Sequence, residues 1–247
     1  MHRRTSSRLG ALAFLAGAFF PLTSMTVGCG SPDPVSTSGG GGSGSTASVG
    51  GGDAGSPPVT VTLHPTSAPL PGETECTVVQ VTNIAIPDAH HVTTCTPVPY
   101  ATNPPSGGPH WPVWAARGKY PTAVPRELYS HNLEHGWIVL SYRCTDDCPL
   151  TVLALEKAFD TADDTYCAAH GDSAARVLLT PDPLLKTPIA MSAWGATYTA
   201  TCIDPVSIAD FIAKRIGRGT EMVCGGGQMP LVVTAACLSG DGGADGG

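Results

Sequence analysis

Basic residues are scarce in this sequence of 247 residues, which has 13 lysines and arginines against 20 aspartates and glutamates. Charged residues make up only 13% of the chain, and no basic patch stands out along it. Proteins that bind nucleic acid cluster positive charge to neutralise phosphates, so nucleic acid is not an expected partner. The sequence also has no G-x-S-x-G motif, no Walker loop and no dinucleotide fingerprint between a strand and a helix. The enzyme classes that depend on these motifs therefore find no support.

Long hydrophobic runs are also missing. The longest apolar stretch near the start, Leu9–Phe20, has twelve positions and follows Arg3, Arg4 and Arg8. It is too short to span a bilayer and fits the core of a signal peptide, which we place at residues 1–28. Removing this segment takes away three arginines and no acidic residue, so the net formal charge falls from −7 to −10.

The sequence Thr26-Val27-Gly28-Cys29 is similar to the bacterial lipoprotein signal, in which the cysteine is lipidated and becomes the mature N-terminus. Thr26 stands where leucine is usual, so cleavage by the ordinary signal peptidase, with secretion, stays an alternative. We expect lipidation of Cys29, with the lipid binding the chain to a membrane. The expected location is the bacterial cell envelope, with the protein facing outside the cytoplasm.

Large apolar residues are almost absent from two further segments. Residues 29–58 contain the anchor cysteine and a Gly/Ser/Thr/Pro linker, and residues 239–247 form a similar tail. Such segments cannot bury enough surface to fold, so we expect a flexible tether and a disordered tail. Residues 59–238 are long enough for one globular domain with its own core.

Nine cysteines are present, and eight remain if Cys29 carries the lipid. An even number in an exported domain predicts up to four disulfides, with 105 possible pairings. We favour Cys76–Cys95 as a local hairpin staple, and expect Cys144 or Cys148 to pair with Cys167. A zinc cluster is the weaker alternative for these residues, because exported thiols are normally oxidised. The complete set is Cys76, Cys95, Cys144, Cys148, Cys167, Cys202, Cys224 and Cys237.

Residues 125–142 are predicted to form a helix followed directly by a buried strand. Pro125 suits the first turn of a helix, and Gly136 suits the positive φ angle that ends one. A helix over 125–135 places His131, Glu134 and His135 on one face, because they are three and four residues apart. The apolar run 137–142 then indicates a strand, which would hold the last helical turn rigidly.

The rest of the domain predicts an α+β fold, approximately β-α-β-β-α from Trp137 onward. Helical spacing is visible over 149–159, and Asp204 with Pro205 predicts the start of another helix that ends near Gly217. Strands are expected at 176–180 and, as one continuous strand, at 189–201. The Thr-, Val- and Pro-rich residues 59–100 predict irregular β structure or an arm.

Several motifs resemble the bacterial family known as domain of unknown function 3105, over roughly residues 100–217. The motifs are Asn103-Pro104-Pro105-Ser106-Gly107-Gly108-Pro109-His110, Gly118-Lys119-Tyr120, His131-Asn132-Leu133-Glu134-His135-Gly136 and Ala193-Trp194-Gly195. The cysteine set and the lipoprotein-like start depart from the family, many of whose members are anchored by a transmembrane helix. The resemblance implies motif positions and no mechanism.

The histidines of these motifs predict a transition-metal site. Two histidines at i and i+4 on one helical face can bind one ion, and a third ligand from a loop completes an open site. We predict His110, His131 and His135 as ligands of copper or zinc, which imidazole suits. Glu134 would be a ligand or would orient a ligand histidine. His64, His90, His91 and His170 show no ligand spacing, and adjacent residues such as His90 and His91 point to opposite faces of a strand.

Two other functions stay open, although a binding module is favoured over an enzyme. The first is a metal-dependent hydrolase or oxidase at the same residues, with Glu134 as general base, since His131–His135 matches the H-x-x-E-H zinc motif. The downstream glutamates, Glu156 and Glu221, show no context comparable to a third peptidase ligand. The second is a surface interaction protein without metal. Five aromatic residues are candidates for a pocket wall beside the histidines, or for a small core under a loop: Trp111, Trp114, Tyr120, Tyr142 and Trp194.

Overall fold

A six-stranded sheet carries the fold, with the strand order β1-β2-β6-β5-β3-β4. The computed structural model describes residues 56–144 and 147–239. The predicted signal peptide, the lipidation of Cys29, nearly all of the linker and residues 240–247 of the tail lie outside this range and stay predictions. The strands are β1 (Val59–Leu63), β2 (Val78–Thr82), β3 (Ile138–Tyr142), β4 (Val177–Pro181), β5 (Ile189–Ala193) and β6 (Ala196–Ala200).

All strand pairs are antiparallel except β3 and β4, which are parallel. Parallel neighbours need a crossover connection, and here it contains two helices. The helices of the described chain are α1 (Arg126–Glu134), α2 (Pro149–Thr161), α3 (Thr165–Ala169), α4 (Pro205–Arg215) and α5 (Pro230–Ser239). The α+β class is confirmed. None of the helices in the described residues is long and apolar enough to cross a membrane.

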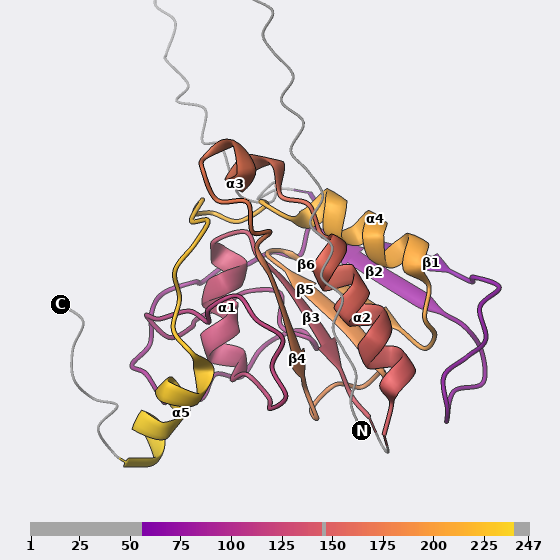
Figure 1. Cartoon of the computed structure of the whole chain (residues 1–247), viewed down its shortest axis with the longest axis horizontal. Helices are drawn as coiled ribbons and strands as arrows, with labels where there is room; N and C mark the ends of the chain where they lie inside the picture. The colour runs from indigo at the N-terminus through magenta and orange to yellow at the C-terminus, as the bar shows by residue number, and fades with distance from the viewer. Residues whose placement is uncertain (1–55, 145–146, 240–247) are drawn as a thin grey trace, which may run out of the picture. The chain divides into compact units, whose positions relative to one another are not determined.

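Each face of the sheet packs against different helices. Side chains alternate along β3, so that Ile138 and Leu140 join the hydrophobic cluster of α2 and α4, while Val139 faces the cluster of α1. Figure 1 shows α2 and α4 side by side over the sheet, as their contacts require. The candidate site therefore belongs to the opposite layer, with α1.

The predicted single strand over 189–201 is wrong, because the chain turns back on itself after Ala193. β5 and β6 form a hairpin in which Ala193 pairs with Ala196, and Trp194 with Gly195 makes the turn. Gly195 has a φ of +64°, a conformation that glycine adopts at no steric cost. The alternation of apolar residues continued through this turn and concealed it.

The described residues contain four disulfides, which are Cys76–Cys202, Cys95–Cys237, Cys144–Cys148 and Cys167–Cys224. The predicted bridge Cys76–Cys95 is wrong, as is a bridge from Cys144 or Cys148 to Cys167. Cys76 precedes β2 and Cys202 follows β6, and these strands are antiparallel neighbours. Strand pairing across the sheet, which the cysteine spacing does not reveal, therefore decides this connectivity.

Candidate metal centre

Four side chains bring potential metal ligands to one point. His91, His110, His131 and Glu134 each offer one ligand atom, and these atoms all lie within 4.8 Å of one another. We call these four residues the histidine cluster. His131 and Glu134 come from α1, His110 from the loop before it, and His91 from the arm that follows β2. Segments distant in the sequence thus converge on a set of three imidazoles and one carboxylate.

The end of α1 is fixed by close backbone packing. Gly136, just past the helix, has a φ of +80°, and a Cβ there would lie 2.9 Å from the Cα of Gly217. The carbonyl of Gly136 accepts a hydrogen bond from the N–H of Gly217, and that of Glu134 accepts one from Glu221. The last turn of α1, with two of the cluster residues, is therefore held in one position.

His110 is fully buried, and its two ring nitrogens have different surroundings. Nδ1 lies 2.8 Å from the carbonyl oxygen of Gly108, which can only accept, so Nδ1 carries the proton. Nε2 lies 3.0 Å from a carboxylate oxygen of Glu134, but without the alignment of a hydrogen bond. If the ring is neutral, the lone pair of Nε2 faces the carboxylate oxygen of Glu134, and the two repel each other. A second proton or a cation would remove this repulsion.

His131 is oriented in the same way. Its Nδ1 lies 2.7 Å from the carbonyl oxygen of Trp111, which leaves Nε2 as the nitrogen available to a metal ion. Burial is the main reason that the pKa of His131 falls to about 4, and the neighbouring His110 and His91 lower it further. His131 therefore stays neutral at physiological pH, which is the form that binds metal.

His91 is the exposed member of the cluster, and a backbone bridge holds it in place. The N–H of Val92 donates to the carbonyl of His110, and the N–H of His110 donates to the carbonyl of His90. This bridge turns the His91 ring onto that of His131, with 4.9 Å between the centroids. His90 is also exposed, but its ring pairs with Asp88 rather than with the cluster. Only one residue of the adjacent pair can reach the cluster, as expected from strand geometry.

Glu134 supplies the negative charge of the cluster. Burial acts to raise its pKa, but the contact with His110, the electrostatic interactions with the His110 and His131 rings and the hydrogen bond from Thr220 together outweigh burial, so the pKa lies below its ordinary value. One carboxylate oxygen also accepts a hydrogen bond from the hydroxyl of Thr220. An ionised carboxylate in this position is a suitable oxygen ligand for a divalent ion.

His135, the third predicted ligand, lies beside the cluster but outside it. Its Nε2 is 3.1 Å from a carboxylate oxygen of Glu221, and its ring contacts those of His131 and Trp114. Its Nδ1 and the Nε1 of Trp114 are buried without a hydrogen-bond partner. Glu221 is thus a neighbour of the H-x-x-E-H motif, although its sequence context did not indicate this contact. Burial is the main cause that lowers the pKa of His135 to about 4.

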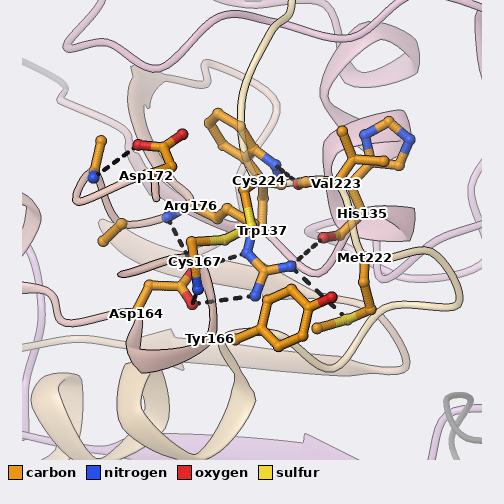
Figure 2. A network of polar contacts seen from close by, with 12 residues as sticks. His135, Trp137, Asp164, Tyr166, Cys167, Asp172, Arg176, Met222, Val223 and Cys224 are labelled. Atoms are coloured by element: carbon orange, nitrogen blue, oxygen red, sulfur yellow. Dashed lines mark hydrogen bonds and ion pairs between the residues drawn. A yellow bond between two sulfur atoms is a disulfide. The ribbon is translucent and has the colours of Figure 1, made fainter. Parts of the chain in front are cut away.

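A buried ion pair, Arg176 with Asp164, contacts the C-terminal end of the same helix. Figure 2 shows Arg176 between Asp164 and the end of α1, with Nε and Nη2 of Arg176 bonded to the carboxylate of Asp164 at 2.7 and 3.1 Å. Its Nη1 donates to the carbonyl of His135 at 2.9 Å. A cation at the C-terminal end of a helix is favourable, because the carbonyls there carry partial negative charge. Arg176 therefore stabilises the turn that presents the site.

The five aromatic residues predicted as a pocket wall lie in different places. Trp114 contacts His131 and His135, and the carbonyl of Trp111 orients His131. Trp194 is buried in the hydrophobic cluster of α1, and Tyr120 packs against that cluster. Tyr142 packs against the cluster on the other face of the sheet. Among the five, Trp114 and Trp111 are the ones whose atoms contact the histidines of α1 and its C-terminal end.

Sequence reasoning missed His91, Arg176, Asp164 and Glu221. His91 reaches the cluster through a backbone bridge to His110, which no local pattern encodes. A signal did exist for Arg176, because it stands at the start of an apolar run, where a charged residue must be paired if it is buried. Its partner, 12 positions upstream, could not be chosen from the sequence.

These features define a disulfide-bonded α+β domain with a His/Glu cluster that could hold a metal ion. The chain belongs to the family described as Protein of unknown function (DUF3105), whose model matches residues 91–225. This match confirms the resemblance inferred from the motifs, and it includes all four residues of the histidine cluster. No curated protein and no solved structure matches the chain.

Proposed function

We propose that the protein is an exported, lipid-anchored module that binds one Zn²⁺ or Cu²⁺ ion through His91, His110, His131 and Glu134. The observation that carries the proposal is the contact between Nε2 of His110 and the carboxylate of Glu134, both turned to the same point as His131. Backbone carbonyls fix the tautomers of two histidines so that their free nitrogens face this point. That arrangement is typical of ligand histidines.

The choice of metal follows from the ligand set. Three nitrogens and one oxygen suit divalent zinc or copper, whereas monovalent copper prefers thiolate and thioether ligands. The eight cysteines of the described chain are all in disulfides, so they offer no thiolate. Disulfides of this number also support export, because they form and persist in oxidising compartments. Lipidation of Cys29 would then hold the module at a membrane.

The ligand number supports binding over catalysis. Zinc sites with four protein ligands usually hold the ion, while catalytic sites keep one position for water or substrate. Glu134 belongs to the ligand set by its position, 3.0 Å from Nε2 of His110, and this proximity favours a ligand over a free general base. Exposure of His91 gives the ion a route to and from solvent on one side of the cluster.

Metal titration by calorimetry with variants tests this proposal. We expect one ion to bind more tightly than micromolar, and His110→Ala or His131→Ala to weaken binding by about 100-fold or more, roughly 2.7 kcal/mol. His91→Ala should cost less, about tenfold, because this ligand is exposed. His135→Ala distinguishes the ligand set seen in the structure from the set predicted from the sequence. Because His135 lies outside the cluster, this variant should lose less metal affinity than His131→Ala.

His90→Ala is the matched control, because this neighbour of His91 is exposed and points away. It should leave the affinity unchanged. The proposal fails if the wild-type protein binds neither Zn²⁺ nor Cu²⁺ more tightly than micromolar, or if all five variants bind like the wild type.

A further inference from the structure

The disulfide Cys144–Cys148 differs from the other three in what it connects. The other bridges join residues 57, 126 and 142 positions apart, whereas this one joins residues only 4 apart. A disulfide stabilises a fold mainly by restricting the unfolded chain, and the restriction grows with the length of the closed loop. The short bridge therefore contributes least to stability, and stability alone does not account for it.

Accessibility sets the same bridge apart. Cys144 is the single exposed cysteine among the described residues, and Cys148 is half-buried. Cys76, Cys202 and Cys167, from two of the long bridges, are buried. Thiol–disulfide exchange begins when a thiolate reaches one of the two sulfur atoms, so access decides which bridge reacts. Here a thiolate from another molecule could reach Cys144.

Cys148 is placed to be the leaving group of such an exchange. It is the N-cap residue of α2, a helix of 13 residues with no side-chain cap and no acidic residue in its first turn. Backbone N–H groups and the helix dipole at an N-terminus stabilise a thiolate, against the opposing negative charge of the adjacent Asp147, and a more stable thiolate leaves faster. Pro149 at the first helical position fixes the chain direction here.

The surface around the bridge is open to solvent and carries both apolar and charged residues. An open depression of about 640 Å³ adjoins it, with Tyr142, Val152 and Leu153 among its lining residues. Leu150 and Leu153, at 72% and 62% exposure, add apolar surface on α2. Asp147 and Glu156 also line the depression and give it negative charge. A partner segment that combines apolar and basic residues next to its cysteine matches this lining.

We propose that Cys144–Cys148 is a redox-active disulfide that exchanges with a dithiol of another exported protein. A partner thiolate attacks Sγ of Cys144, the bond between the two sulfurs breaks, and Cys148 leaves as a thiolate that takes up a proton. The second partner thiol, after losing its proton, attacks the mixed disulfide at the partner sulfur, and Cys144 leaves and is protonated. The partner is oxidised to a disulfide, and this chain gains two electrons as two thiols. The exchange does not depend on the metal site.

Stepwise reduction of the full chain in glutathione buffers, with alkylation and mass spectrometry, tests the first part. Cys144 and Cys148 should be alkylated at a ratio of reduced to oxidised glutathione at least about tenfold lower than the ratio at which any other bridge opens. The double variant Cys144→Ser/Cys148→Ser should keep the remaining three bridges and unfold at nearly the wild-type denaturant concentration. Opening of all four bridges together, or of a long bridge first, would overturn the proposal.

The leaving-group role is tested at Leu150, which is exposed in the first turn of α2. Leu150→Lys should speed reduction of the oxidised protein by dithiothreitol, and Leu150→Glu should slow it, each several-fold, because charge near the helix N-terminus changes thiolate stability. The wild-type protein should also oxidise dithiothreitol through this exchange, and the double serine variant should not oxidise it at that rate. Equal rates for Leu150→Lys and Leu150→Glu would contradict the assigned role of Cys148.

Discussion

Two buried polar groups meet at the C-terminal end of α1, and they are built differently. The Arg176–Asp164 pair has hydrogen-bond partners for the guanidinium on the carboxylate and on the carbonyl of His135. In the histidine cluster, by contrast, a buried imidazole nitrogen of His110 faces the carboxylate of Glu134 without a hydrogen bond. Buried polar groups are normally satisfied within a fold. The paired group therefore has a structural role, while the cluster could hold a metal ion.

The largest effect is expected from breaking the satisfied group. Arg176→Met would leave the buried carboxylate of Asp164 without its partner, which should lower the free energy of unfolding by about 3–5 kcal/mol. Urea denaturation measures this loss. The matched control is Lys214→Met, which breaks the exposed pair with Asp210 and should cost less than about 1 kcal/mol. Equal losses in the two variants would show that the Arg176 pair does not support the helix end.

The double variant Arg176→Met/Asp164→Leu sharpens this comparison. It removes both charges, so it should recover part of the stability that Arg176→Met loses; recovery is incomplete because the N–H of Cys167 loses its hydrogen bond to Asp164. Its metal affinity reports whether the helix end keeps its position without the ion pair.

A smaller effect is expected from pH in the metal-free protein. The pKa of His131 falls from its ordinary value of 6.5 to about 4 on folding. The unfolded chain therefore binds a proton before the folded chain does, so stability is complete above pH 6.5 and is lost as the pH falls toward 4. The loss due to His131 should be on the order of 2–3 kcal/mol. Asp164, whose pKa is lowered on folding, should contribute a loss only below its ordinary value of 3.8.

Denaturation at several pH values with chelator present checks this expectation. His131→Gln should flatten the dependence between pH 6.5 and 4. Identical pH profiles for the wild type and His131→Gln would mean that burial of the histidine has no energetic consequence.

Local patterns in the sequence predicted α1 to within a residue at each end, because Pro125 and Gly136 mark its limits chemically. The shared face of His131 and Glu134 followed from that helix. His91 was missed because its position depends on a bridge across 19 residues to His110. The disulfides were mispaired for the same reason, since strand neighbours such as β2 and β6 are separated by more than 100 residues. Residue spacing thus predicts which side chains share a face of one helix or strand. Which helices, strands and loops contact one another depends on the fold.

The central claim, that the histidine cluster is a metal site and the Arg176 pair is not, is tested most directly by anomalous scattering. Crystals of the protein loaded with Zn²⁺ would be measured on both sides of the zinc absorption edge. The account predicts one strong peak about 2.0–2.2 Å from Nε2 of His110, Nε2 of His131 and a carboxylate oxygen of Glu134. A peak at another position, such as His90 with Asp88, or no peak within reach of these three atoms, would contradict it.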